Sequence, residues 1–312
     1  MAVTSGKVSG TFQTITDISG NVAGTWKSVD EGYANVSGTW ETVFIAFQAT
    51  SFITVTGTST TTTVPQGANA IHVQAAVGGG GGSVIGGDYD KAGGESAGAG
   101  GGSGAYISDK IFSVVAGETL TLNAGTGGAA SNNPFNLYNA VGSPGTDTTL
   151  SGSTTGSIFS LTGGGGSSGT GGGVQGPLRT NTAGTAGSAT ISGTAITSGS
   201  FNQSGVVVSV STCTGGPVGT FNQSGGGASG TNPGNCGGDN CQIGGGNGAA
   251  SYAGNIAGGA GSPQGQNING AAGNRGSGGG GGGAQYGSFS GARTAGGNGG
   301  NGEIQYRFLR VS

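Results

Sequence analysis

The first 46 residues alternate apolar and polar side chains in three similar units that recur every 14 residues. The units read VSGTFQTI, VAGTWKSV and VSGTWETV, at residues 8–15, 22–29 and 36–43. Alternation with a period of two predicts a short strand in each unit, and the polar residues between the units predict turns. We therefore predict a small repeated β-strand region over residues 1–46.

An aromatic side chain occupies the same position in each unit, as Phe12, Trp26 and Trp40. Three strands of this size are too small to be stable alone, so this aromatic ladder needs a partner. Two interpretations remain open. The ladder attaches the chain to copies of itself or to another protein, or the strands form a small sheet packed on the rest of the chain.

Longer alternating runs predict the strands of a main domain. Ile53 and Val55 alternate with threonines, and residues 70–77 (AIHVQAAV) alternate until they reach a run of five glycines. Residues 111–116 and 119–123 predict a hairpin, because a turn-forming segment separates two short apolar runs.

The last strand of this domain is predicted far along the chain, at residues 303–308. Ile304, Tyr306 and Phe308 share one face of that strand, and this face must be buried. We therefore predict that residues 303–312 join residues 47–130 in one β-sandwich, with the chain between them inserted.

Glycine dominates that inserted stretch: the chain has 79 glycines, and only 8 lie in its first 75 residues. Each interior glycine costs about 1 kcal/mol relative to alanine in an α-helix, which excludes helix there. Extended threefold helices of the polyproline II type lack internal hydrogen bonds, but neighbours can satisfy one another where glycine fills every contact. We predict that residues 131–302 form packed polyglycine II helices with exposed loops.

Charge is scarce, at 7% of residues, and the formal net charge is −3. No basic stripe is present to neutralise phosphates, so we expect no nucleic-acid partner. No apolar run reaches the length of a membrane span, so we expect no membrane insertion. The first residues lack the apolar core of a signal peptide.

Residues for catalysis are few. His72 is the only histidine, and it faces away from Ile71 and Val73 in a predicted strand, which is typical of a structural role. Paired-acid catalysis needs two carboxylates held in place, and Asp88 and Asp90 are weak candidates because they lie on one predicted flexible loop. We therefore predict no catalytic residue.

We also predict no metal site and no cofactor. The cysteines are Cys213, Cys236 and Cys241, an odd number that makes a poor disulfide framework. Cys236 and Cys241 flank a short loop and can be either bonded or reduced. Neither choice supplies enough ligands for a metal ion.

Recognition by loops is what remains. Aromatic residues in the glycine-rich part are isolated, and some must anchor the rods to the sheet. Those at loop tips would be binding anchors, because aromatic side chains dominate contact energies. The candidate receptor-binding residues are Tyr89, Phe135, Tyr138 and Tyr252.

The order of several motifs resembles the glycine-rich domain of bacteriophage tail and tail-fibre proteins, over roughly residues 50–312. The motifs are TVPQGANAIHVQAAVGGGGGS, AYISDKIFSVVAGETLTLNAGTGG, GGGGGGAQYGS and GGNGGNGEIQYRF. The chain is similar, more distantly, to the extracellular glycine-rich domain of anaplastic lymphoma kinase. This resemblance implies an all-β fold, a jelly-roll-like β-sandwich with an inserted polyglycine II bundle.

The resemblance extends to the distal adhesins of some long tail fibres, whose polyglycine bundles present variable loops to bacterial surface receptors. This chain differs from them in having a recognisable sandwich, so no receptor-loop position is transferred. The VSGTW repeats are similar to short repeats that precede such domains in other phage proteins.

The expected function is a non-enzymatic adhesin at the tail or tail-fibre tip of a virion, released when the host lyses. Its expected partners are other tail or fibre proteins, bound through residues 1–46, and a host cell-surface protein or glycan. A homotrimer and a monomer capping a trimer both remain open. The alternatives are a structural spacer or decoration protein of the virion, and an ice-binding protein, which needs a flat face of small residues at strict three-residue spacing.

Overall fold

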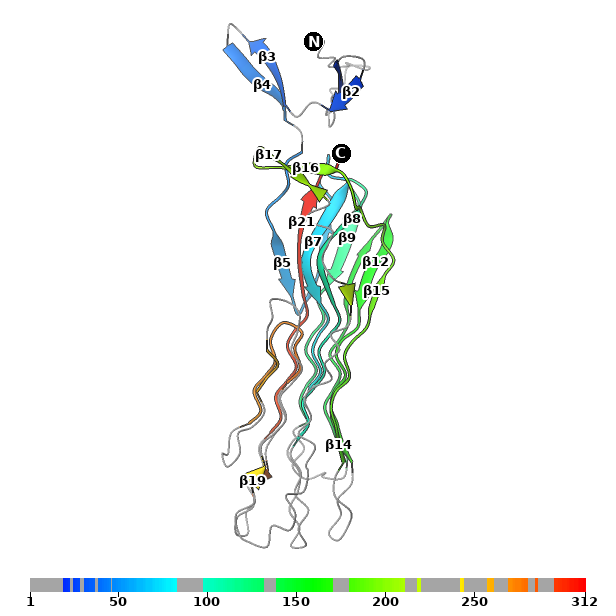
Figure 1. Ribbon diagram of the computed structural model, residues 1–312, viewed down its shortest axis with the longest axis vertical. Helices are drawn as coiled ribbons and strands as arrows, with labels where there is room; N and C mark the ends of the chain where they lie inside the picture. The colour runs from blue at the N-terminus through cyan, green and yellow to red at the C-terminus, as the bar shows by residue number, and fades with distance from the viewer. Residues whose placement is uncertain are drawn as a thin grey trace.

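The computed structural model shows an all-β protein whose strands lie along one long axis (Figure 1). It describes residues 47–82, 98–131, 139–170, 180–210, 257–260, 269–279 and 295–312. It also describes the backbone of short strands at residues 19–22, 25–28, 31–36, 39–45, 218–219, 242–243 and 284–285. These described parts contain no α-helix.

Two five-stranded antiparallel sheets form a β-sandwich, as predicted. The first sheet has the order β18-β8-β7-β21-β5 and the second the order β15-β12-β11-β9-β6. The strands of the first are β5 (Ile53–Thr56), β7 (Ala70–Val77), β8 (Tyr106–Ser113), β18 (Val218–Gly219) and β21 (Glu303–Leu309). Those of the second are β6 (Ser59–Thr63), β9 (Thr119–Asn123), β11 (Thr148–Gly152), β12 (Gly156–Leu161) and β15 (Ala189–Ile191).

The core lies between the two sheets and is filled from alternate strand positions. The predicted inward face of the last strand is confirmed, since Ile304, Tyr306 and Phe308 are all buried in it. Strand β21 pairs with β7 on one side and β5 on the other, as expected for a C-terminal strand returning to the first sheet. Leu120 and Leu122 meet this face from β9. Each fully buried side chain of this size contributes about 1.5–3 kcal/mol.

The hairpin predicted from residues 111–116 and 119–123 does not form. Strand β8 pairs with β7 in the first sheet, whereas β9 pairs with β6 and β11 in the second. The chain crosses between the sheets at a corner where Gly117 takes a φ of +82°. Alternation predicts that each run is a strand but does not predict which strand it pairs with. The core contacts of the two strands determine that pairing.

The carboxylate of Glu118 holds this corner. It is buried, and it accepts hydrogen bonds from the amides of Val115, at 2.7 Å, Thr154, at 3.1 Å, and Thr155, at 2.9 Å. The Thr155 hydroxyl donates a fourth. Burial alone would raise the pKa of Glu118, but these hydrogen bonds outweigh it and hold the pKa below its ordinary value.

The N-terminal repeats differ from the prediction of one strand per unit. The second and third units each form a hairpin: β1 (Ser19–Val22) with β2 (Thr25–Ser28), and β3 (Glu31–Val36) with β4 (Thr39–Ile45). The first unit lies outside the described residues. The registers pair Val22 with Thr25 and Val36 with Thr39. Two residues, AG or SG, therefore separate the strands. Such pairs favour a two-residue hairpin connection, and this local preference outweighs the alternation through it.

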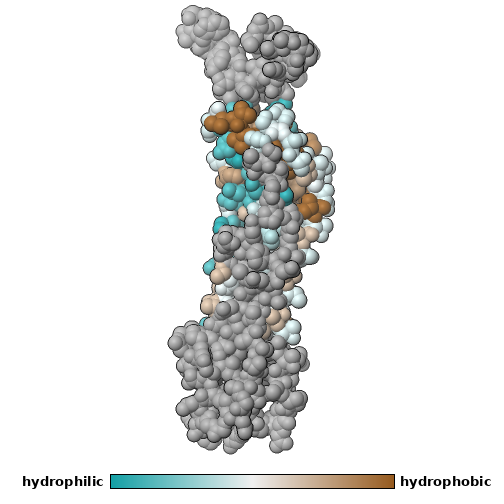
Figure 2. Space-filling model, in the orientation of Figure 1, coloured by the Kyte–Doolittle hydropathy of each residue, from teal (hydrophilic) through white to brown (hydrophobic). Residues whose placement is uncertain are grey.

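A third hairpin covers part of the outer face of the first sheet. It joins β16 (Ser200–Gln203) to β17 (Val206–Ser209) through Ser204 and Gly205, both with positive φ. Phe201 and Val210 pack there on Ala70, Ile111 and Leu309 of the sheet. Val206 and Val207 of β17 are exposed. Figure 2 shows an apolar area on the sandwich, just below the grey atoms at the top of the view.

We expect Glu118→Ala to lower the free energy of unfolding by about 2–3 kcal/mol at pH 7, because hydrogen bonds to a charged acceptor are lost together. The donors bind the carboxylate, so its stabilisation is present above the ordinary pKa of 4.5 and is lost as the pH falls through the lower pKa of the folded state. Chemical denaturation between pH 3 and pH 7 measures both effects.

Thr121→Ala, on the exposed side of β9, is the matched control and should change stability little. Glu118→Gln should remove the acid dependence and should also lower stability at pH 7, because its amide nitrogen cannot accept the hydrogen bonds of the oxygen that it replaces. An unchanged pH profile in Glu118→Gln would contradict the role assigned to the carboxylate.

Candidate functional site: the rod bundle and its far end

Most sandwich strands continue at one end into extended, glycine-rich rods that run side by side (Figure 1). We name each rod after its strand. They are the β7 rod (78–82), β8 rod (98–105), β9 rod (125–131), β11 rod (142–147), β12 rod (162–167), β15 rod (183–188) and β21 rod (295–302). Residues 269–279 form a further rod, the unattached rod, and together these segments make the rod bundle.

This arrangement differs from the predicted division at residue 131. The β7, β8 and β9 rods lie before that position, while strands β11, β12 and β15 of the second sheet lie after it. The bundle is therefore interleaved with the sandwich along the chain and is not one insertion. Composition located the glycines correctly but did not reveal the short strands between them.

The β7 rod lies at the centre of its neighbours. Its amides donate to three rods in turn: Gly78 and Gly81 to the β8 rod, Gly79 and Gly82 to the β11 rod, and Gly80 to the β21 rod. Its carbonyls accept from three others, the β9, β12 and unattached rods. The same partner returns every third residue, which is the signature of a threefold polyglycine II helix.

No side chain fits in this central rod. A Cβ built on Gly80 would lie 1.9 Å from the carbonyl oxygen of Ser277, and one on Gly81 would lie 2.0 Å from that of Gly165. The other three glycines of the rod are equally enclosed by backbone. Five consecutive glycines are thus required by contact with neighbours on all sides, and the hydrogen bonds offset the entropy of ordering them.

In the outer rods, glycine is needed only on the side that contacts a neighbouring rod. In the β15 rod Gly184 and Gly187 are buried, while Thr185 and Ser188 are exposed. Thr182, which precedes the rod at the same spacing, is exposed too. Small neutral side chains also cover the neighbouring rods, where the hydroxyls of Thr126 and Thr146 lie 3.2 Å apart.

Two polar contacts, the first of them buried, fix the bundle to the sandwich. The Thr148 hydroxyl donates to the Val77 carbonyl and accepts from the Gly125 amide, both at 2.8 Å. Arg275 of the unattached rod, with a φ of +42°, donates through Nε and Nη2 to the buried carboxylate of Glu303, at 2.9 and 2.8 Å. These contacts hold the rods to the ends of the sheets.

The end of the bundle away from the sandwich, here called the far end, carries a three-stranded sheet. It has the order β10-β13-β14, formed by β10 (Asn139–Val141), β13 (Ser168–Thr170) and β14 (Thr180–Thr182). These strands directly extend the β11, β12 and β15 rods. A two-stranded pair, β19 (Gln242–Ile243) and β20 (Ala284–Gln285), lies at the same end (Figure 1).

The candidate receptor-binding residues Tyr89, Phe135, Tyr138 and Tyr252 all lie outside the described residues. Their positions in the chain are informative nevertheless. Tyr89 lies between the β7 and β8 rods, and Phe135 and Tyr138 lie between the β9 rod and β10. The described rod residues on either side of these segments are at the far end.

The candidate attachment residues are divided. Phe12 lies outside the described residues, whereas Trp26 is in β2 and Trp40 is in β4. The register pairs Trp26 with Asn21 and Trp40 with Asn35, so the two tryptophans hold equivalent places in the two hairpins.

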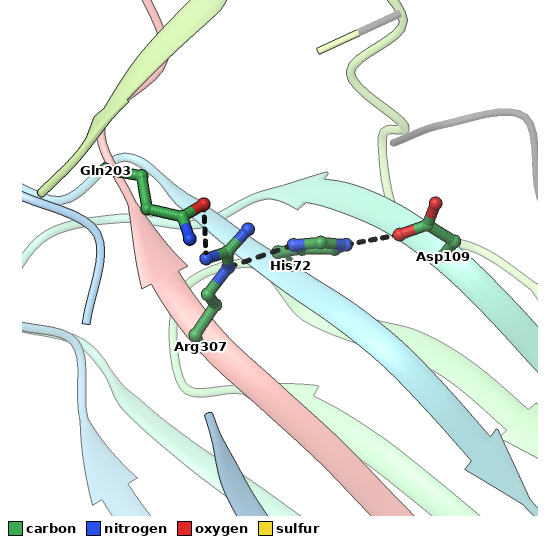
Figure 3. A network of polar contacts seen from close by, with 4 residues as sticks. All are labelled: His72, Asp109, Gln203 and Arg307. Carbon is green, nitrogen blue, oxygen red and sulfur yellow. Dashed lines mark hydrogen bonds and ion pairs between the residues drawn. The ribbon is translucent and has the colours of Figure 1, made fainter. Parts of the chain in front are cut away.

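A polar cluster around the buried side chains of His72 and Arg307 occupies the outer face of the first sheet (Figure 3). His72 Nε2 lies 2.6 Å from Asp109 Oδ1, and Arg307 Nε donates to His72 Nδ1 at 3.1 Å. Arg307 Nη1 donates to Gln203 Oε1 at 2.9 Å. Because Nδ1 accepts a hydrogen bond, the neutral imidazole carries its proton on Nε2 and donates to Asp109.

Both imidazole nitrogens are therefore engaged, and the ring is buried with 3% exposure. The cluster joins the first sheet to the β16–β17 hairpin. Neither imidazole nitrogen is free to bind a substrate. Alternation placed His72 opposite Ile71 and Val73, and this is confirmed. The same alternation in β21 puts Arg307 on the outer face, a signal that sequence reasoning left unused.

Within the described residues, no group of three His, Cys, Asp or Glu side chains is placed to hold a metal ion. None of the described segments forms a helix long and apolar enough to cross a membrane. The described side chains thus supply shape, hydroxyls and amides, together with a few enclosed charges.

A β-sandwich whose strands extend into a polyglycine II bundle defines an all-β glycine-rich protein. The family model of the glycine-rich domain matches residues 54–309, and the chain belongs to that family. The match begins in β5 and ends with the last residue of β21, so it spans the sandwich and the bundle and leaves out the N-terminal hairpins. No curated protein matches the chain.

We expect Gly80→Ala to disrupt the bundle, because its Cβ would overlap the Ser277 carbonyl oxygen. The thermal midpoint should fall by at least about 5 °C, since overpacking costs about 1–3 kcal/mol and backbone displacement adds to it. Amide hydrogen exchange should accelerate in the rods more than in β9 and β11.

Ala129→Ser is the matched control, because residue 129 is exposed on an outer rod and the hydroxyl meets solvent. It should leave both measurements unchanged. Fast exchange of the wild-type rod amides, at the rate of an unstructured peptide, would exclude the mutually bonded bundle.

Proposed function

We propose that the chain is a bacteriophage virion protein at the tail or tail-fibre tip, where it acts as a non-enzymatic adhesin. The observation that carries the proposal is the difference between the two ends of the domain. One end receives the chain from the N-terminal hairpins, and the other is where successive rods are joined.

The attachment end is defined by hydrogen bonds. Residues 47–50 enter beside the C-terminal end of β21, where the Thr50 amide donates to the Phe308 carbonyl at 3.0 Å. The β21 rod leaves the opposite end of the same strand. The hairpins that carry Trp26 and Trp40 therefore join the domain at the end remote from the rods, which suits binding to other tail or fibre proteins.

The far end suits recognition. The described residues that flank segments 83–97, 132–138 and 171–179 lie at this end, and the three segments include Tyr89, Phe135 and Tyr138. The rods that support them are held mostly by hydrogen bonds from backbone to backbone within the bundle. Substitutions in the connecting segments therefore leave the bundle contacts intact, as a variable receptor-binding surface requires.

The resemblance to tail and tail-fibre proteins, and more distantly to the glycine-rich domain of anaplastic lymphoma kinase, supports a role outside the cell. A host cell-surface protein or glycan is the proposed ligand, and the virion tail is the proposed location, with release at host lysis. The engaged nitrogens of His72 support a function without catalysis. A homotrimer is compatible with the hairpins acting as an oligomerisation region.

The rival within the same setting is a structural spacer or decoration protein. The ice-binding alternative finds one favourable feature, the regular spacing of Thr182, Thr185 and Ser188. Other outer rods present different residues, such as Ala129 and Ser143, so the small exposed side chains are not uniform.

Replacement of residues 83–97 by a glycine-serine connector of equal length tests the adhesin role in a phage that carries this chain. Deleting the whole of 131–300 is unsuitable, because it removes three strands of the second sheet. Adsorption to host cells should slow by at least about tenfold, since aromatic anchors each contribute about 2 kcal/mol or more. Particles should assemble with normal amounts of the protein.

Ser204→Asn at the opposite end is the control, because asparagine tolerates the positive φ found there. It should adsorb like the wild type. If replacements of 83–97, 132–138 and 171–179 all leave adsorption unchanged, the spacer interpretation replaces the adhesin.

The attachment role makes a separate prediction. Trp26→Ala combined with Trp40→Ala should reduce incorporation of the protein into particles by at least about tenfold, because buried tryptophans are frequent interface hot spots. Quantitative blotting of purified particles measures it. The sandwich should keep its thermal midpoint, and normal incorporation of the double variant would remove the tryptophans from the interface.

A further inference from the structure

The segment that links the N-terminal hairpins to the sandwich contacts one buried cationic side chain, Arg307. The Phe52 ring lies against the guanidinium, with Cζ 4.4 Å from the ring centroid. Phe201 of β16 lies on it at 5.1 Å, and Gln203 of the same strand accepts from Nη1. The linking segment and the β16–β17 hairpin therefore share a single cationic anchor.

The linking segment is also hydrogen-bonded to the β16–β17 hairpin and to β21. The Ala49 amide donates to the Asn202 carbonyl at 2.9 Å, and the Phe308 amide donates to the Thr50 hydroxyl at 2.9 Å. Displacement of Arg307 would thus loosen a connected junction, which we define as residues 47–52 and 200–210.

His72 fixes the direction of Arg307. The hydrogen bond from Nε to Nδ1 exists only while Nδ1 is unprotonated. Protonation would place a second N–H donor against the first, and two positive charges about 3 Å apart would repel each other. The Phe52 ring, 5.4 Å from the imidazole, would share in any movement.

Asp109 is the group that opposes this effect. Its carboxylate contacts Nε2 and stabilises either form of the ring, and its φ of +54° lies in the left-handed region. Among the described residues, Asp109 from β8 and Arg307 from β21 are the charged groups facing the imidazole. The remaining neighbours on this face are Gln203 and the apolar side chains around Phe201.

We propose that His72 is a proton-operated switch at the junction: protonation of Nδ1 releases Arg307, and with it the linking segment and the β16–β17 hairpin. Neutral His72 keeps the linking segment and the β16–β17 hairpin fixed on the sandwich. Acid converts the same junction into a loose joint while the sandwich and the rod bundle stay folded.

The direction of the pKa agrees with this geometry. Burial is the largest cause and lowers the pKa of His72; Asp109 raises it by hydrogen bonding and charge, and the charge of Arg307 lowers it. The folded junction therefore favours neutral His72. Its stabilisation is complete above the ordinary value of 6.5 and is lost as the pH falls from there through the lower pKa of the folded state.

The test uses the full chain and benefits from His72 being its only histidine. Nuclear magnetic resonance of the imidazole gives the tautomer and the titration midpoint without ambiguity. Amide hydrogen exchange, corrected for the intrinsic effect of pH, gives the protection of the junction. We expect the Nε2–H tautomer at neutral pH and exchange at least about tenfold faster in the junction below the midpoint.

Strands β11 and β12 provide the internal control and should keep their protection through the same range. His72→Gln keeps an acceptor for Arg307 without titrating, so its junction should stay protected at both pH values. Arg307→Lys removes the planar donor and should expose the junction at every pH.

The proposal is overturned if His72 titrates while junction exchange is unchanged, or if β11 and β12 lose protection together with the junction. Persistence of the pH dependence in His72→Gln would also overturn it. The titration of His72 and the amide exchange of the junction are both measured on the wild-type protein. Comparing them tests the proposal even if a variant fails to fold.

Discussion

Backbone-to-backbone hydrogen bonding between rods, at distances that leave no space for a Cβ atom, is the constraint on which this structure depends. A side-chain core excludes water with apolar surface. The rod bundle instead satisfies buried amides and carbonyls directly, thread to thread. This explains how the glycine-rich rods form a packed structure although they contain very few large apolar residues.

The sandwich supplies what the rods lack, which is a way to set their positions. Glycine-rich rods have few side chains that could select one neighbouring rod over another. Seven rods begin or end at a strand of the sandwich, and pairing within the two sheets delivers each rod to its place. The contacts of Thr148 and the ion pair between Arg275 and Glu303 then fix the rods to the ends of the two sheets.

Much of this fold could be predicted from the sequence, because its strands have clean alternation. The core face of β21 and the outward place of His72 followed from a period of two. The partner of β9 did not, since alternation specifies faces and leaves neighbours open. Strands β11 and β15 are too short and too poor in large side chains to be distinguished from the glycine-rich runs around them.

The candidate sites divide in a similar way. Composition favoured recognition through loops, but the cluster of Asp109, Gln203 and Arg307 around His72 joins residues from four strands. Its members are separated by up to 235 positions in the chain, as for His72 and Arg307. Only the pairing of β7 with both β8 and β21 brings them together, and one sequence alone does not state that pairing.

The central place of the β7 rod has a consequence for how the molecule is made. Residues 78–82 are synthesised early, yet one of their partners is Gly300, near the end of the chain. Contacts so distant along the chain carry a large closure entropy and slow the search for the native arrangement. A ribosome therefore releases almost the whole polypeptide before its innermost thread can be enclosed, and assembly of the domain is a late, concerted event.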